Sequence, residues 1–346
     1  MIRFEKRRFT LVKRRSQEGK RIAQHEIKIL SNQYHCSKMT LSKKLTTASL
    51  APFLLITSIA LFGNAQNANA TIKMPSAPAP NSTQAVCKSL DDWNEPTHAR
   101  HIYGNTWYVG TCGISVVLIA TPQGHVLIDS APEAASAAVR QNILSLGVNL
   151  RDIKTILFTH EHHDHMGGLA SMQKATGAKV LSRKNVLEVL KSGKNDRRDP
   201  QFKELHGFNP VANVHAITDS ATINIGKTRI QHIPMAGHAP GGSGWAWQEC
   251  EKTVCKKLVF ADSLGSISDD VYRFSAPDSL ANQLKESSER LAKTACDILI
   301  TGHGTASDLL ARLDGEKPLV DDKACVSYAQ AGALNLESRL QKEQKK

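Results

Sequence analysis

Six consecutive residues, His160 to His165, hold four histidines and two acids. In an extended segment, alternate side chains project to the same side, so His160, His162 and Asp164 are expected to reach one site together. His165 has the opposite parity and needs a turn, which the glycine pair at 167–168 permits, to face a second centre. Imidazole and carboxylate groups suit zinc. The segment therefore predicts a metal site, with an opportunistic histidine-rich surface loop as the alternative.

Two zinc centres need further ligands from elsewhere in the chain. His238 and His303 share one context, because each follows an apolar strand and a glycine and precedes a small residue. We expect both to complete the site. His163 is expected beside the ligands rather than among them. The remaining histidines of the globular part lack this context and are expected on the surface or in the core: His98, His101, His125, His206, His215 and His232.

The elements that must position these residues follow an α+β pattern. The apolar strand 155–159 runs directly into the histidine segment, and strand 297–300 leads to His303. Residues 192–213 are polar and irregular and predict a surface loop. The order of strands, a helix and then a strand ending in histidine occurs twice, which indicates two similar halves with helices outside mixed sheets. Helices are predicted over 132–147, 184–191, 277–294 and 326–342, and further strands over 106–109, 115–120, 124–129, 179–182, 214–218, 221–225, 228–234, 244–247 and 258–261.

The charge of +12 is concentrated at the N-terminus. Residues 1–38 carry about +8, and residues 39–70 add two lysines and no acid, which leaves about +2 for residues 71–346. A near-neutral body argues against nucleic acid as a partner.

Residues 39–70 have the pattern of a signal peptide. Lys43 and Lys44 precede an apolar run from Leu45 to Phe62, and small residues follow. We expect cleavage after Ala70, with a cut after residue 65 as the second choice and a membrane anchor as the alternative. Residues 1–38 are then either an over-extended start before Met39 or a basic extension. We expect residues 71–88 to form a flexible lead-in and residues 89–346 to form the domain of a periplasmic monomer without stable membrane association.

Six cysteines lie in the exported part, and export permits disulfides. Cys250 and Cys255 flank a short polar turn and suit a staple across a hairpin. Six cysteines allow fifteen connectivities, and free buried thiols are the alternative. The other four are Cys87, Cys112, Cys296 and Cys325.

The motif His160-x-His162-x-Asp164-His165, with His238 and His303 downstream, resembles the metallo-β-lactamase superfamily over roughly residues 90–340. Glyoxalase II, lactonases and RNA-processing nucleases carry similar signatures. Further stretches resemble the third subclass of true β-lactamases, in which the metal ligands are all histidine and aspartate: WYVGTCGISVVLI (107–119), VLIDSAP (126–132), GHAPGGSGW (237–245) and VFADSL (259–264).

The resemblance implies a four-layer αββα sandwich with two zinc ions at one sheet edge. It implies that His160, His162 and His238 hold the first ion. Asp164, His165 and His303 would hold the second. It also implies the disulfides Cys87–Cys112, Cys250–Cys255 and Cys296–Cys325.

The chain departs from the family pattern at two positions. Gly265 stands where the family often has a serine or threonine that contacts the substrate carboxylate, and Gly304 follows the last ligand where proline is frequent. By resemblance alone, Ser263 and Ser266 are expected to bind the carboxylate. Asp129 is expected either to support a ligand or to cap its strand, and Asp262 to bridge the metals only if the chain is like glyoxalase II.

A zinc pair lowers the pKa of water towards neutrality, so we expect hydroxide attack on the β-lactam carbonyl, with Asp164 orienting the attacking group. The expected partner is a small-molecule β-lactam. A lactonase or thioesterase of the same fold is the first alternative, and a non-catalytic zinc-binding protein is the second. The motifs of a serine β-lactamase are absent from the sequence.

Overall fold

The computed structural model describes residues 72–76 and 87–345, all within one compact unit. The predicted basic extension, signal peptide and cleavage site lie outside the described residues, as does most of the lead-in. Within the described part, no helix combines the length and the apolar character needed to cross a membrane.

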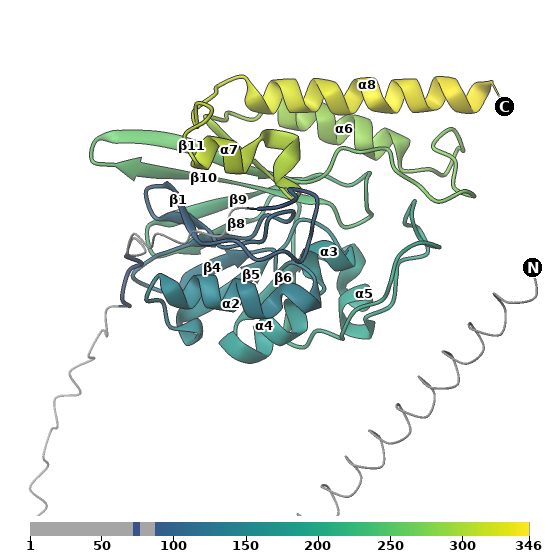
Figure 1. Cartoon of the computed structure of the whole chain (residues 1–346). Helices are drawn as coiled ribbons and strands as arrows, with labels where there is room; N and C mark the ends of the chain where they lie inside the picture. The colour runs from purple at the N-terminus through teal and green to yellow at the C-terminus, as the bar shows by residue number, and fades with distance from the viewer. Residues whose placement is uncertain (1–71, 77–86, 346) are drawn as a thin grey trace, which may run out of the picture. The chain divides into compact units, whose positions relative to one another are not determined.

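Two sheets face each other (Figure 1). In the first sheet β1 to β4 are antiparallel and β4 to β7 are parallel, in sequence order: β1 (Arg100–Tyr103), β2 (Thr106–Tyr108), β3 (Val117–Ile119), β4 (His125–Ile128), β5 (Ile153–Leu157), β6 (Lys179–Arg183) and β7 (Val214–Ile217). The second sheet has the order β12-β11-β10-β9-β8 and is antiparallel except for the β11–β12 pair: β8 (Thr222–Ile225), β9 (Thr228–Pro234), β10 (Ser243–Glu251), β11 (Val254–Ala261) and β12 (Ile298–Thr301).

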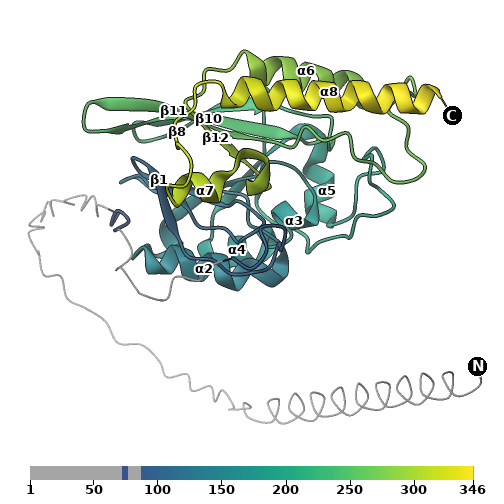
Figure 2. The same ribbon diagram turned by 45° about the horizontal axis from the view of Figure 1, so that its top comes forward.

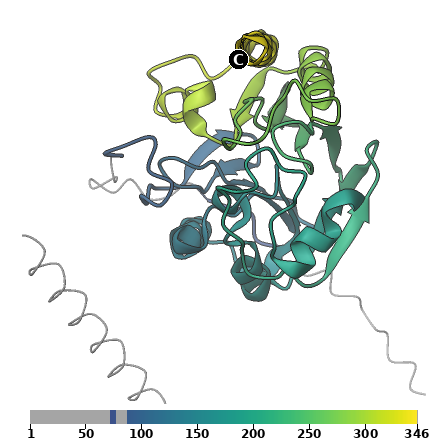
Figure 3. The same cartoon turned by 90° about the vertical axis from the view of Figure 1, so that its right-hand side faces the viewer.

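Helices cover the outer face of each sheet. The first sheet is covered by α2 (Ser136–Ser145), α4 (Leu169–Thr176) and α5 (Leu187–Ser192). The second is covered by α6 (Ala281–Ala292) and α8 (Ala324–Gln344), which run side by side in Figure 2. Figure 3 looks along α8 and shows these two helices on one side of the sheets and the teal helices on the other. The four-layer αββα sandwich is confirmed.

The central strands are buried on both faces, which explains their continuous apolar sequence. Leu127 packs towards the first helical layer, whereas its neighbour Ile128 packs into the core between the sheets with Trp245 and Phe260. A third apolar cluster fills the space between the second sheet and its helices. Because side chains alternate along each strand, one face of each sheet packs against its helices and the other packs against the opposite sheet. The fold therefore contains three apolar layers.

The sequence analysis predicted neither β1 nor α7 (Leu309–Leu313). The expectation of an extended histidine segment is wrong beyond His162, because α3 (His163–Met166) begins there. The amides of His165 and Met166 both donate to the carbonyl oxygen of His162, at 3.1 and 3.0 Å, and so close a helical turn.

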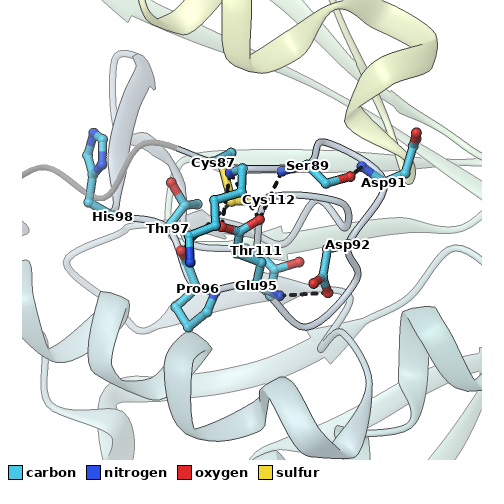
Figure 4. Close-up of a disulfide and its surroundings, with 12 residues drawn as sticks. Cys87, Ser89, Asp91, Asp92, Glu95, Pro96, Thr97, His98, Thr111 and Cys112 are labelled. Atoms are coloured by element: carbon cyan, nitrogen blue, oxygen red, sulfur yellow. Dashed lines mark hydrogen bonds between the residues drawn. A yellow bond between two sulfur atoms is a disulfide. The ribbon is translucent and has the colours of Figure 1, made fainter.

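The described residues contain three disulfides, with the pairings that the family resemblance implied. Cys250 and Cys255 are directly opposite each other in the β10–β11 hairpin, as the polar turn predicted. Cys296–Cys325 ties the segment before β12 to the start of α8. Cys87–Cys112 fastens the first described loop to the segment after β2 (Figure 4).

Candidate metal centre

Three buried histidines form a first cluster. His160 follows β5, His162 caps α3, and His238 lies in the turn after β9. Their ligand atoms all lie within 4.8 Å of one another. The Nε2 atom of His160 is buried without a hydrogen-bond partner among the described residues, as expected for a nitrogen that a metal ion would occupy.

The second cluster lies directly beside the first and joins an acid to two histidines. Oδ2 of Asp164 lies 3.1 Å from Nε2 of His165 and 3.2 Å from Nε2 of His303. The two histidine nitrogens are 3.3 Å apart. His160 also groups with Asp164 and His165 in a set of potential ligands. All six residues that the sequence nominated as ligands therefore meet at one edge of the sandwich.

Buried carboxylates hold two histidines of the first cluster from behind. Nδ1 of His160 lies 2.7 Å from Oδ1 of Asp262, and Nε2 of His162 lies 2.8 Å from Oδ2 of Asp199. Both acids are at most 2% exposed. Such contacts fix the ring orientation and leave the other nitrogen, Nε2 of His160 and Nδ1 of His162, for a metal.

Two further histidines of the clusters are held in a similar way. His238 donates from Nδ1 to the carbonyl oxygen of Gly265 at 2.9 Å, and Nδ1 of His165 lies 3.2 Å from Oδ2 of Asp129. Asp129, which follows β4, also accepts the amide of Thr159 at 2.7 Å, so it both supports His165 and caps the end of the neighbouring strand β5. These donor atoms fit zinc, which prefers neutral imidazole and carboxylate ligands.

Burial is the main influence on the protonation of His160 and His238 in the first cluster. Burial, together with the neighbouring imidazoles of His165 and His162, holds the pKa of His160 well below its usual value. Burial and the imidazole of His162 lower the pKa of His238 to about 3. Both rings are therefore neutral at pH 7, which is the form that binds a metal.

Burial has the opposite effect on the pKa of two acids beside the clusters, Asp262 and Glu161. It raises the pKa of Asp262 well above the usual range, and burial with the nearby charge of Asp199 raises the pKa of Glu161 to about 7. Carboxylates are destabilised in this way when no cation balances their charge. A bound metal would supply that charge.

Asp199 and Glu161 were not found by sequence analysis. Asp199 belongs to the 192–213 segment, which is irregular as predicted but is not wholly on the surface, because Asp196 and Asp199 are buried. A run of charges normally indicates a solvated loop, so no signal in the sequence marked it as a support for His162.

Trp93 is a third residue that the sequence did not reveal. Its ring centroid lies 5.8 Å from those of both His163 and His303, and the side chain is 37% exposed. Gly113 permits this placement, since a Cβ at that position would lie 2.8 Å from the backbone of Asp92. Trp93 therefore forms an apolar wall beside the second cluster.

The loop that carries Trp93 is fixed at both ends. The carboxylate of Glu95 accepts the amides of Lys88 and Ser89, at 2.9 and 3.0 Å, and its carbonyl oxygen accepts the amide of Cys112 at 2.9 Å. Figure 4 shows Ser89 and Glu95 beside the Cys87–Cys112 disulfide.

The two serines predicted to contact substrate flank the turn after β11. Ser263 and Ser266 are both partly exposed, and the Ser266 hydroxyl donates to the carbonyl oxygen of Asn335 on α8 at 3.4 Å. Gly265 lies between them and a Cβ there would make only ordinary contacts, the nearest with Ile267 at 3.4 Å. Position 265 could therefore hold a larger residue.

Residues 109–303 match the family model of the Metallo-beta-lactamase superfamily. Among solved structures, the chain is similar to MEM-A1, a subclass B3 metallo-beta-lactamase from a soil metagenome library. That match has 36% identity and a TM-score of 0.71 and covers 73% of this chain and 99% of that chain. It is also similar to the metallo-beta-lactamase SMB-1 bound to 2-mercaptoethanesulfonate, with 42% identity, a TM-score of 0.70 and coverage of 73% and 99%.

A more distant relative is the probable polyketide biosynthesis zinc-dependent hydrolase PksB of Bacillus subtilis (strain 168), 27% identical over 34% of this chain and 44% of that protein. The chain thus spans less than half of the curated relatives that it matches. The fold and these similarities together identify the family, and the histidine and aspartate clusters fit zinc binding. The chain belongs to the metallo-beta-lactamase superfamily, in which its structural neighbours are subclass B3 enzymes.

Proposed function

We propose that this protein is a zinc-dependent β-lactamase that hydrolyses the amide bond of penicillins, cephalosporins and carbapenems and so confers antibiotic resistance. The observation that carries the proposal is the pair of adjacent clusters, three histidines beside an aspartate and two histidines. The similarity to subclass B3 enzymes over almost their whole length supports the same reaction.

The charge balance favours two zinc ions. Five carboxylates are buried in and around the clusters: Asp129, Glu161, Asp164, Asp199 and Asp262. Arg198 faces Glu161, but it is half exposed and pairs with Asp196. Buried charge is unfavourable unless it is paired. Two divalent ions would offset most of the negative charge, whereas one would leave the site strongly acidic.

In the proposed reaction, the residues of the two clusters hold the metal ions, and one of them also orients the attacking group. Zinc at these positions would lower the pKa of a water towards neutrality and polarise the lactam carbonyl. We assign His160, His162 and His238 to the first ion and Asp164, His165 and His303 to the second. Asp164, which faces both His165 and His303, would also orient the attacking group.

Substrate would lie between the metal clusters and the exposed residues around them. Trp93 offers an apolar surface beside His303, and Ser263 and Ser266 offer hydroxyl groups near the turn that holds His238. Because the Ser266 hydroxyl is engaged with α8, Ser263 is the stronger candidate for the substrate carboxylate.

An oxidising compartment fits the three disulfides. We therefore assign the enzyme to the periplasm, with residues 39–70 as the signal peptide, and we expect it to act there as a monomer. The periplasm is where a β-lactamase would meet its substrates.

A panel of substrates tests the proposal. The purified protein should hydrolyse a carbapenem and a cephalosporin, lose turnover in a chelator and regain it with zinc. His162→Ala should lose zinc and turnover together. Hydrolysis of a lactone or a thioester, with no turnover of any β-lactam, would move the assignment to the first alternative. Bound zinc without hydrolysis of any of these substrates would indicate a non-catalytic zinc-binding protein.

A further inference from the structure

Glu161 lies between two of the proposed ligands, yet its side chain serves neither cluster. It is 4% exposed. Its two carboxylate oxygens accept the backbone amide of Gly241 at 2.9 and 3.1 Å. Glu161 belongs to the segment that carries His160 and His162, whereas Gly241 belongs to the turn that carries His238. The contact therefore joins the two segments that supply the first cluster.

The turn is built to receive this carboxylate. A Cβ at position 241 would lie 2.4 Å from Oε2 of Glu161 and 2.8 Å from Cγ1 of Val186, so only glycine fits without displacement. The turn is closed on itself as well, because the amide of Met235 donates to the carbonyl oxygen of Gly242 at 2.9 Å. Holding Gly241 consequently holds the whole turn, His238 included.

A buried carboxylate is an unusual choice for a packing role. It is stable only if its oxygens are hydrogen-bonded, and an apolar side chain would fill the same space at a smaller cost. The site already contains four other buried acids. An acid can accept the Gly241 amide, which an apolar residue cannot, and the nearby cation, Arg198, already pairs with Asp196.

We propose that Glu161 is a positioning residue that locks the His238 turn onto the His160–His162 segment and so preorganises the first zinc centre. The proposal rests on the zinc site of the proposed function, but not on the identity of the substrate. Supporting contacts of this kind typically change metal affinity by 10- to 100-fold.

Zinc affinity, measured by competition with a chromophoric chelator, tests whether the Glu161–Gly241 contact (the lock) organises the first zinc centre. Glu161→Ala should weaken one of the two zinc sites by about tenfold or more. It should also alter the visible spectrum of the cobalt-substituted protein, which reports the histidine geometry. Glu161→Gln keeps an acceptor for the Gly241 amide and should restore zinc affinity to within about threefold of wild type, as expected for a conserved hydrogen bond.

Glu249 provides a matched control. It is also a buried glutamate, 6% exposed, and it accepts the amide of Asn105 at 3.3 Å near the far end of β10. Glu249→Ala should lower the thermal stability of the metal-free protein without changing zinc affinity or the cobalt spectrum. This control separates the loss of any buried acid from the loss of the lock.

Gly241→Ala approaches the same contact from the other side and does not depend on the folding of Glu161→Ala. It should weaken the same zinc site. Wild-type zinc affinity in Gly241→Ala or Glu161→Ala would overturn the proposal, as would a Gln variant as impaired as the Ala variant. These readouts need no substrate, so a protein that binds two metals but hydrolyses no β-lactam would refute the proposed function and leave the lock standing.

Discussion

Nδ1 of His160 and Oδ1 of Asp262 lie 2.7 Å apart, although 102 residues separate them in the chain. His160 follows β5 of the first sheet and Asp262 follows β11 of the second. Both side chains are at most 1% exposed. The contact therefore joins the two sheets at the edge where the metal clusters lie, and it leaves Nε2 of His160 pointing away from the acid.

Asp262→Ala should weaken zinc binding and turnover about 10- to 100-fold, because the His160 ring loses the acceptor that orients it. Asp262→Asn retains an acceptor oxygen and should be less impaired. Zinc content after dialysis, measured beside the initial rate of β-lactam hydrolysis, checks the order of the two variants. Equal zinc content in Asp262→Ala and wild type would contradict a supporting role for Asp262.

Trp93→Ala should raise KM about fivefold and leave kcat and zinc content nearly unchanged, since an apolar contact worth about 1 kcal/mol is removed without touching a ligand. Asp91→Ala is a suitable control, because Asp91 lies on the same loop. Its hydrogen bond runs from the backbone amide to the Ser89 hydroxyl at 3.2 Å, so the substitution leaves that bond in place. Steady-state kinetics with a cephalosporin distinguishes the two. An unchanged KM in Trp93→Ala would exclude Trp93 from the substrate site.

Removing Cys87–Cys112 should affect both stability and substrate binding. The bridge closes a separation of 25 residues, and such a bridge stabilises by about 3 kcal/mol. The Cys87→Ser/Cys112→Ser variant should therefore melt at a lower temperature and show a raised KM, because the loop that carries Trp93 is freed. The matched variant Cys250→Ser/Cys255→Ser lies in a distant hairpin and should keep the wild-type KM. A raised KM in both would mean that the effect is not specific to the Trp93 loop.

The residues of the two clusters could be predicted from sequence because each of them lies in a segment that follows a strand, and the apolar pattern reveals those strands. His160 and His303 occupy equivalent places after β5 and β12, and the C-terminal ends of these two strands lie at the same edge of the sandwich. The layers of the fold were predictable for the same reason. Strands that are buried on both faces appear in the sequence as continuous apolar runs.

The supports of those ligands were not predictable, because they depend on long-range contacts that leave no local pattern. Asp199 lies in a polar irregular segment and meets His162 only in the folded chain. Glu161 lies within the motif, between His160 and His162. Its position in the sequence gave no indication that it would accept the amide of Gly241. The helical turn at α3 was also missed, since its four residues are too few to show a helical period.

Stability should depend on pH through Glu249, which lies away from the metal clusters. Burial raises the pKa of Glu249 to about 7, from 4.5 in the unfolded chain. The folded state therefore holds a proton that the unfolded state releases between pH 4.5 and 7, so this contribution to stability is present below pH 4.5 and is lost as the pH rises through 7. Relative to Glu249→Gln, wild type should lose up to about 3 kcal/mol over that range. Urea unfolding of both proteins at pH 5 and pH 8 measures it, and parallel pH profiles would refute the assignment.

The most direct test of the dinuclear β-lactamase is a zinc titration of the metal-free protein, followed through the rate of carbapenem hydrolysis. We expect two equivalents of zinc to bind and the rate to reach its plateau as the second site fills. A protein that takes up zinc at both clusters and still leaves carbapenem and cephalosporin intact would contradict it.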